Sequence, residues 1–445
     1  MRRLLAILIV VFAPLHAWAV DVERVTSPGG IEAWLVQDHS NPVVSMRFAF
    51  KGGSELDPMG KAGLSNLAAS TMDEGAGDLD SQAFQQILAD QSITLRFDAG
   101  LDRFSGQVKT LTENLDQSFD LLRLALSQPQ FDAEPVARLK SQIIAGIRAD
   151  SEDPGRLAYN ALFANFFPGH GYAVDSDGTA QSVTALEPED LRTFVKTRLA
   201  RSNLIIGVVG DITPERLGLL MDHAFGALPE TPSVKRGGDV APKATGRLQV
   251  IERDIPQSTI VFGHGGLKRD DPDYYAALVM NHILGGGSFT SRLYDEVREK
   301  RGLAYSVGSS FYPLDHAGLV IGSAATENAR VSETIDVIRA EWARMTAGDV
   351  SAQELDNAKT YISGAFPLTF TSTDAIARVL VAMQLNKLGI DYLDKRKAYI
   401  NAVDMDDVKR VAATYLHPDA IETVVVSNPA GGAPPPGPGA PHLPR

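Results

Sequence analysis

The chain has 445 residues, of which 44% are hydrophobic and 22% are charged, so it is long enough for two or more globular domains of ordinary composition. Its formal net charge of −13 argues against nucleic acid or an anionic membrane surface as a partner, because the net field repels both. The chain contains no cysteine, which fits a compartment where free thiols are oxidised.

The first nineteen residues have the pattern of an export signal. A basic start, Met1-Arg2-Arg3, precedes an apolar run from Leu4 to Leu15 that is too short to span a bilayer, and Ala17-Trp18-Ala19 offers a small-x-small cleavage site. We therefore expect residues 1–19 to be a signal peptide, a mature chain that starts near Val20, and a periplasmic or otherwise exported product. No later run reaches the roughly 18 apolar residues of a membrane-spanning helix, which predicts a soluble product without a membrane partner.

The first half of the mature chain, residues 20–228, alternates strand and helix patterns. The expected order is strand 43–50, helix 61–72, strands within 93–108, helices 111–127 and 133–148, helix 188–199 and strand 204–209. One more helix follows, with Thr213 as its N-cap and Pro214 in its first position.

The segment 229–246 is rich in proline and glycine and has no hydrophobic period, which predicts a solvated linker. Beyond it, residues 247–427 repeat the order of the first half: strand 258–263, helix 273–284, strands 304–311 and 318–325, helices 331–346 and 352–364, helix 405–416 and strand 421–426. Ser351 and Glu354 form a capping-box pattern. Residues 428–445, almost all proline, glycine and alanine, predict a disordered tail.

This repeated order predicts an α+β fold made of two homologous half-domains. Each half should form a mostly antiparallel or mixed sheet with helices packed on one face. The two halves should face each other across a cleft, which is a common position for a binding site.

Several common catalytic motifs do not occur in the sequence. There is no phosphate loop, no Gly-x-Ser-x-Gly elbow and no thiol nucleophile, and a glycine triplet such as Gly285–Gly287 is by itself more often a turn than a binding loop. None of the nine histidines lies three or four residues from another, so no helix presents a paired imidazole site for zinc. His264 and His282, near the second half's first strand and the glycines, are the two candidate ligands that remain.

The segment LGGGSFTSRLYDEVREKRGLAYSV, residues 284–307, resembles the C-terminal half-domain signature of the pitrilysin/insulinase family of zinc peptidases, which includes the mitochondrial processing peptidases. The duplicated order of elements extends the resemblance over nearly the whole mature chain. In that family an arginine and a tyrosine seven residues later reach the peptide at the zinc site of the first half. The resemblance implies these roles for Arg298 and Tyr305, and substrate binding by Gly285, Gly286, Gly287 and Ser288.

The first half departs from the family pattern. Active members carry His-x-x-Glu-His on the first long helix, but the matching segment here places Asn66, Ala69 and Ser70 at those positions, and the downstream glutamate position falls at Ala145 and Gly146. Amide and hydroxyl oxygens bind Zn²⁺ weakly, so no metal or cofactor is expected in this chain. Asp73 and Glu74 follow, but two acids at a helix end are more often a solvated terminus.

The resemblance thus implies a subunit that is inactive alone and becomes part of a zinc metalloendopeptidase when it pairs with a homologous His-x-x-Glu-His subunit. In that heterodimer the partner would carry the zinc, and Arg298 and Tyr305 would act on the peptide in trans. Two alternatives stay open. The chain is an inert scaffold or peptide-binding member of the family, or it is a self-sufficient hydrolase that uses other ligands such as His264 or His282.

Overall fold

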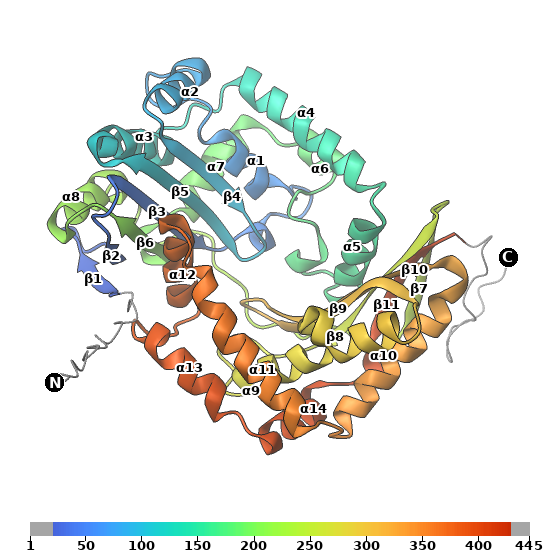
Figure 1. Ribbon diagram of the computed structural model, residues 1–445. Coiled ribbons are helices and arrows are strands. Elements are labelled where there is room, and N and C mark those ends of the chain that lie inside the picture. Colours follow the sequence, from blue (N-terminus) through green and yellow to red (C-terminus); the bar gives the residue numbers. More distant parts are fainter. Residues whose placement is uncertain (1–20, 429–445) are drawn as a thin grey trace, which may run out of the picture.

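The computed structural model describes residues 21–428, so the predicted signal peptide and all of the predicted tail except Asn428 lie outside the described residues. Two sheets, one in each half of the chain, lie on opposite sides of the molecule (Figure 1). Within residues 21–428, no helix is both long and apolar enough to cross a membrane.

The first sheet has six strands in the order β1-β2-β6-β3-β5-β4. All neighbours are antiparallel except β2 and β6, which run parallel. The strands are β1 (Glu23–Thr26), β2 (Glu32–Gln37), β3 (Val43–Lys51), β4 (Thr94–Ala99), β5 (Arg103–Leu111) and β6 (Leu204–Gly210).

The second sheet has five strands in the order β7-β11-β8-β10-β9, with one parallel pair, β7 and β11. The strands are β7 (Leu248–Glu252), β8 (Gln257–Gly265), β9 (Ala304–Pro313), β10 (Gly318–Glu327) and β11 (Glu422–Ser427). If β1 is set aside, both sheets have the same order and the same position for the parallel pair. The predicted α+β class and the predicted duplication are therefore confirmed.

Fourteen α-helices are described in residues 21–428. Those of the first half are α1 (Leu64–Thr71), α2 (Ser81–Asp90), α3 (Leu115–Ser127), α4 (Ala133–Asp150), α5 (Pro154–Phe166), α6 (Ala180–Thr184), α7 (Pro188–Arg198) and α8 (Pro214–Phe225). Those after the linker are α9 (Tyr274–Asn281), α10 (Val331–Thr346), α11 (Ala352–Ala365), α12 (Thr373–Leu385), α13 (Tyr392–Ala402) and α14 (Met405–Tyr415).

The local start signals read from the sequence are present in the structure. The Thr213 side chain accepts a hydrogen bond from the Arg216 amide at the start of α8. Ser351 and Glu354 form the reciprocal capping box of α11. Sequence patterns missed β1, β2, β7, α2, α5, α6, α12 and α13, and they placed β4 and β5 within one range, 93–108, without the boundary between them.

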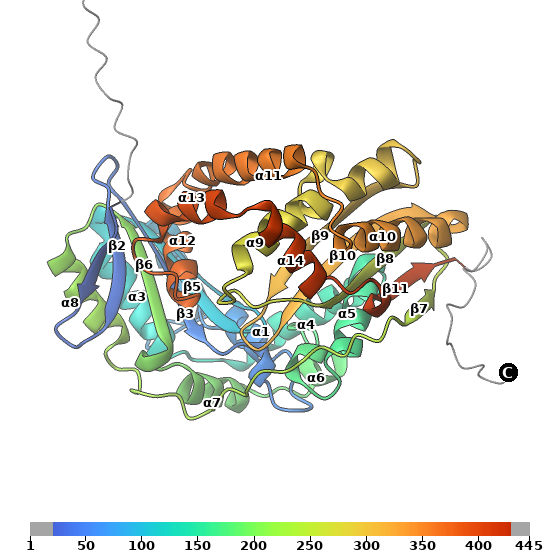
Figure 2. The ribbon, with the colours of Figure 1, turned by 90° about the horizontal axis from the view of Figure 1, so that it is seen from below.

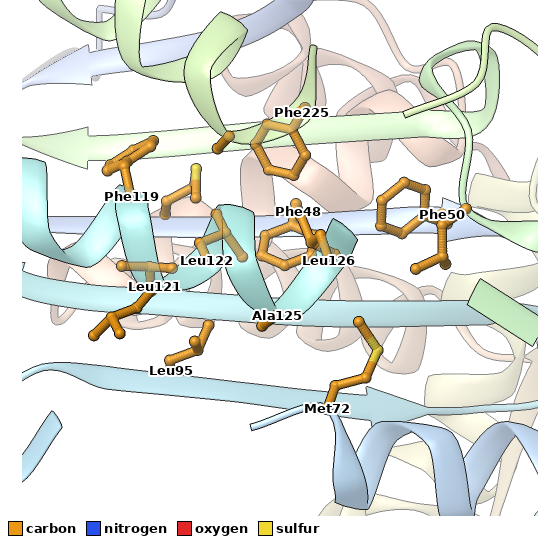
Figure 3. Close-up of a cluster of buried hydrophobic side chains, with 14 of the residues drawn as sticks. Phe48, Phe50, Met72, Leu95, Phe119, Leu121, Leu122, Ala125, Leu126 and Phe225 are labelled. Atoms are coloured by element: carbon orange, nitrogen blue, oxygen red, sulfur yellow. The ribbon is translucent and has the colours of Figure 1, made fainter. Parts of the chain in front are cut away.

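Successive residues of β3 point to opposite faces of the first sheet, and both faces are largely buried. Met46, Phe48 and Phe50 point to one face, where Figure 3 shows Phe48 and Phe50 among side chains of α3 and the Phe225 ring of α8. The Phe48 and Phe225 rings meet edge to face at 5.4 Å. Because successive strand residues point to opposite faces, Ser45 and Arg47 must face the other way.

That other face of the first sheet is covered by α12, a helix from the second half of the chain (Figures 1 and 2). Arg47 makes a bidentate ion pair with Asp374, at 2.6 and 2.8 Å. Gly207 of β6 permits the close approach, since a Cβ atom there would lie 2.8 Å from the Ala377 carbonyl oxygen and 2.9 Å from the Leu380 Cβ.

In the same way, a helix of the first half, α5, packs against β8 and β11 of the second sheet. Leu162 and Phe166 of α5 are buried together with Val261, Leu319 and Val424, while Phe262 and Val425 face α10 and α14 on the opposite side. Each sheet thus has helices of its own half on one face and a single helix of the other half on the second face. The two halves share apolar cores through α5 and α12.

Charged residues close to the linker also join the halves. Glu55 has only 2% of its side chain exposed, and it accepts hydrogen bonds from the Gly53 amide at 2.7 Å and from Arg236 of the linker at 3.1 Å. Arg236 also donates to Asp315, in the turn between β9 and β10, at 2.7 Å. Burial raises the pKa of Glu55 from 4.5 to about 7, with a smaller contribution from the neighbouring Asp102 carboxylate.

This raised pKa predicts a pH dependence of stability. The folded state binds more protons than the unfolded state between about pH 4.5 and 7, so the free energy of unfolding falls as pH rises through that window. A shift of this size corresponds to at most about 3 kcal/mol. We expect urea unfolding from pH 4.5 to 8 to show a shallower decline in Glu55→Gln than in the wild type. Parallel pH profiles would contradict this role for Glu55.

Candidate functional site

The three residues at the expected zinc-motif positions lie on α1 and are engaged within the protein. Asn66 donates its side-chain amide to Asp177 Oδ1 at 3.0 Å, and the Ser70 hydroxyl donates to the Asn66 carbonyl oxygen at 2.9 Å. Ala69 is 3% exposed and belongs to the apolar core of the first half. The side-chain contacts of Asn66 and Ser70 are therefore to groups of the chain itself, and Ala69 has no metal-binding atom.

A guanidinium group lies next to these positions. Arg156, in the first turn of α5, donates to Asp177 Oδ2 at 3.3 Å, so Asp177 bridges Asn66 and Arg156. Arg156 also pairs with Asp150 at 3.2 Å and Asp175 at 3.4 Å. Burial raises the pKa of Asp177, with the adjacent Asp175 as the next cause. The carboxylates around this part of α1 are therefore paired with Arg156, a cation of the chain itself.

The donor set does not fit zinc. In the part of the chain that the structure describes, no group of three or more histidine, cysteine, aspartate or glutamate side chains is placed to hold a metal ion. Ala145 and Gly146, at the downstream ligand position, are exposed on α4, which packs beside α1. Glu74 is not a solvated terminus as the sequence suggested: it is 14% exposed and bonds Ser81 and Arg138 of α4, each at 2.5 Å.

The two candidate histidines have structural partners. His264 is fully buried, its Nδ1 bonds the Gly265 carbonyl oxygen at 2.7 Å, and its Nε2 accepts from the Trp342 indole at 3.0 Å. Burial lowers the pKa of His264 to about 4, so the ring is neutral. His282 stacks on Tyr361 with ring centroids 4.9 Å apart. Both nitrogens of His264 are thus occupied, and neither ring belongs to a metal-binding group in residues 21–428.

The glycine segment continues α9 as a π-helical turn, His282–Gly286, rather than forming an open loop. A second π-helical turn, Tyr294–Glu299, contains Arg298. π-Helical turns are rare and are frequent at functional sites. Ser288 follows the first turn with φ at 46°, a left-handed conformation that is uncommon for a residue with a side chain.

Gly285 lies where the π-helical turn touches β9. A Cβ atom at this position would lie 2.3 Å from the Ser309 Oγ and 2.8 Å from the Ser309 amide nitrogen, and Ser309 is held by Asn281 through hydrogen bonds of 2.7 and 3.0 Å. A glycine at position 285 is therefore required for the π-helical turn to pack against β9.

We expect Gly285→Ala to reduce the free energy of unfolding by about 1–3 kcal/mol, the usual cost of overpacking, when measured by urea denaturation. The control is Gly364→Ala in α11, where a Cβ atom meets nothing within 4 Å and where alanine stabilises a helix by about 0.5–1 kcal/mol. Equal stability of the two variants would contradict the assigned contact.

The side chains of Arg298 and Tyr305 lie next to each other. The Arg298 guanidinium is 4.7 Å from the Tyr305 ring centroid and 4.8 Å from the Tyr294 ring centroid, and it also hydrogen-bonds the Tyr294 hydroxyl. The Tyr305 side chain, at the start of edge strand β9, is 77% exposed. Tyr294, which the sequence reasoning missed, lies four residues before Arg298 and thus holds the guanidinium between two rings.

A pocket of about 580 Å³ lies between the first turns of α5 and strands β8, β9 and β10 of the second sheet. Gly285, Gly286 and Ser288 line it from one side, together with Ser306, the residue after Tyr305; Gly287, Arg298 and Tyr305 are not in its wall. Gly155 and Tyr159 of α5 line it from the other side and also line a second pocket of about 480 Å³ that contains Arg156 and Tyr312. The two pockets share a wall at α5, so the space beside the glycine segment extends towards Arg156.

Tyr159, Arg156 and Tyr312 were missed because α5 was missed. The signal is present in Asp153-Pro154, an N-cap residue followed by proline at the first helical position, and the Asp153 side chain does accept from the Arg156 amide at 2.7 Å. Sequence pattern could have located the helix, but not the sheet of the second half against which it packs.

Comparison with known proteins agrees with this architecture. Residues 185–362 match the family model described as the peptidase M16 inactive domain. The chain is 25% identical over 371 residues to the non-peptidase homolog YmxG of Helicobacter pylori, covering 82% of this chain and 84% of that protein. It is 27% identical over 314 residues to an uncharacterized zinc protease of Streptomyces coelicolor, covering 69% and 68%.

A solved structure is also similar. The crystal structure of a peptidase M16 inactive domain from Pseudomonas fluorescens superposes with a TM-score of 0.85 at 27% identity, covering 92% of this chain and 98% of that one. The matched fold and the family model agree with each other. The chain is therefore similar to proteins of the peptidase M16 family, and its residues 185–362 match the family's inactive domain.

Proposed function

We propose that this chain is the non-zinc subunit of an exported heterodimeric peptidase. A homologous subunit with an intact His-x-x-Glu-His motif supplies the metal, and this chain supplies Arg298 and Tyr305 to the same peptide substrate. The observation that carries the proposal is the exposed, pre-formed Arg298–Tyr305 pair beside the glycine-lined pocket, in a chain whose own motif positions are filled by Asn66, Ala69 and Ser70.

The chemistry of the two side chains suits this role. When bound in the partner, zinc activates a water molecule for attack on a peptide carbonyl. The Tyr305 hydroxyl donates a hydrogen bond to the carbonyl oxygen as negative charge develops on that oxygen. Tyr305 is 77% exposed, so a substrate can reach the hydroxyl without a rearrangement of the chain. The Arg298 guanidinium, held between the Tyr294 and Tyr305 rings, offers its remaining N–H groups to substrate carbonyl oxygens.

The glycines of the π-helical turn support substrate binding. Gly285 and Gly286 line the pocket without side chains, so the backbone of an extended peptide has room to approach. Tyr159 and the polar Ser306 and Ser310 complete the wall. A cleft of this composition accepts a peptide main chain through hydrogen bonds and apolar contact, and it does not require one particular side chain.

The test mixes this chain with a candidate homologue that carries His-x-x-Glu-His. Cleavage of a quenched fluorescent peptide library is measured for each protein alone and for the mixture, and association is measured by analytical ultracentrifugation. We expect no turnover by this chain alone, a stable one-to-one complex, and a rate in the mixture at least tenfold above that of the partner alone. Metal analysis of the purified chain should show no stoichiometric zinc.

A scaffold role is the competing proposal, and one observation favours it. Arg156 pairs with Asp150, Asp175 and Asp177, so the carboxylates near the expected zinc-motif positions already have a counter-charge from this chain. If the complex forms but the mixture is no faster than the partner alone, the scaffold role is correct. Stoichiometric zinc together with activity of the isolated chain would overturn both proposals.

A further inference from the structure

A small, strongly basic pocket lies at the junction of the two halves, away from the glycine segment. Its volume is about 220 Å³, and it is lined by the end of β3, the linker, the segment after β8, the turn between β9 and β10, and the segment after α12. Eleven residues form the wall; two are aspartates and five are cations, namely Lys51, Arg236, Lys268, Arg269 and Lys387. This local excess of positive charge contrasts with the net charge of −13 for the whole chain.

Three of the five cations already have partners. Arg236 is held by Glu55 and Asp315. The Lys268 ammonium lies 2.9 Å from both carboxylate oxygens of Asp239. The Arg269 guanidinium lies 3.8 Å from the Tyr274 ring centroid and donates to two tyrosine hydroxyls.

The other two cations, Lys51 and Lys387, are different. Neither ammonium group has a hydrogen bond or an ion pair with any residue in the described range 21–428. Burial lowers the pKa of Lys51, and the charge of Lys387 is the next largest cause, so the two amines lie near enough to repel each other. Asp315 offsets part of this repulsion at Lys51, but it contacts neither amine, and a bound anion would stabilise both ammonium groups at once.

The backbone at Lys387 gives an independent indication. Lys387 follows the last residues of α12 with φ at 53°, and the Leu388 amide bonds the Met383 carbonyl oxygen at 3.0 Å, which is a helix ending that glycine usually forms. A non-glycine residue in this conformation costs about 1 kcal/mol or more. Strained residues of this kind are frequent at binding sites, and here the strain places a lysine in the pocket wall.

His316, in the same wall, has a buried polar atom that is not hydrogen-bonded to any described residue. The residue is 9% exposed, and its Nε2 is a buried atom without a hydrogen-bond partner in the part of the chain that the structure describes. Its nearest carboxylate contact is a distant one, 3.9 Å from Nδ1 to Asp239. The pocket thus combines two unpaired ammonium groups with one unused ring nitrogen.

We propose that this pocket binds a small phosphate-type oxyanion between Lys51 and Lys387. Lysine acts as a point charge towards phosphate, and a multivalent anion neutralises both amines at once. The volume favours a small ligand, because pockets for drug-sized molecules are roughly 300–1,000 Å³. Lys51 belongs to the first half and Lys387 to the segment after α12, so the bound anion also ties the two halves of the chain together.

The experiment titrates inorganic phosphate into the full-length protein at constant ionic strength, with calorimetry and thermal unfolding as readouts. We expect a dissociation constant of about 1 mM or tighter and a rise in the unfolding temperature that sodium nitrate does not reproduce. Lys51→Met and Lys387→Gly should each weaken phosphate binding at least tenfold. Lys109→Met, at an exposed position of β5, is the matched control and should bind phosphate within twofold of the wild type.

Lys387→Gly separates loss of binding from loss of folding, because glycine relieves the positive φ and should leave the phosphate-free protein at least as stable as the wild type. A parallel titration with ATP distinguishes the source of the anion: tighter binding than phosphate identifies the terminal phosphate of a larger molecule, and weaker binding identifies the free ion. The proposal is overturned if phosphate has no effect beyond that of nitrate, or if Lys51→Met and Lys387→Gly bind phosphate as the wild type does.

Discussion

Tyr305→Phe is expected to lower the turnover of the proposed two-subunit peptidase by about 10²–10³, the usual consequence of removing one oxyanion donor. The substitution removes only the hydroxyl, and the Tyr305 side chain is 77% exposed, so the folding of β9 should not depend on it. The phenyl ring of the variant still stacks on Arg298. The measurement is kcat and KM for peptide cleavage at saturating concentrations of this chain.

The kinetic pattern distinguishes chemistry from assembly. If the hydroxyl acts on the transition state, kcat falls while KM and the affinity between the subunits stay near wild-type values. Tyr312→Phe is the matched control, because Tyr312 lies on the same strand and lines the neighbouring pocket, and it should change kcat less than threefold. An unchanged kcat for Tyr305→Phe would contradict the proposed role of Tyr305.

Arg198→Met is expected to produce the largest loss of stability in the first half, about 3–5 kcal/mol. Arg198 and Asp57 form an ion pair at 3.0 Å with side-chain exposures of 6% and 3%. The guanidinium also donates to the Leu56 carbonyl oxygen at 2.8 Å and to the Ser65 hydroxyl at 3.1 Å. Without it, the Asp57 carboxylate remains buried and uncompensated in the segment that leads into α1.

Urea denaturation at two pH values tests this assignment. Burial already raises the pKa of Asp57, and the loss of Arg198 should raise it further, so the deficit of the variant should be smaller at pH 5 than at pH 8. The double variant Asp57→Asn with Arg198→Met should recover part of the loss. Arg216→Met, which breaks the exposed pair with Asp116, is the control and should cost less than about 1 kcal/mol.

The sequence pointed to some residues of the candidate site and missed others. The resemblance placed Arg298 and Tyr305 in one site, and the structure brings their side chains within 4.7 Å. Their spacing of seven residues does not by itself predict this contact, because it depends on a π-helical turn and on the start of β9. Tyr294 completes the arrangement through a helical spacing of four residues, which could have been noticed only after the turn was known.

The contacts between the charged groups around α1 could not be predicted from the sequence for a different reason. Asn66 and Asp177 are 111 positions apart in the chain, and Arg156 contacts Asp177 only because α5 folds back towards α1. No local period or motif connects residues at such distances. The ion pairs beside Asn66 could therefore be recognised only from the three-dimensional arrangement.

The sequence by itself determined the duplicated α+β plan, the residue types missing from the zinc-motif positions, and the capping of helices such as α8 and α11, because periodicity, composition and capping act over a few residues. The tertiary structure decided which helix covers which sheet. The exchange of α5 and α12 depends on complementary surfaces, such as Gly207 beneath Ala377 and Leu380, that lie far apart in the chain. The pocket between Lys51 and Lys387 likewise exists only because that exchange brings the end of β3 next to the end of α12.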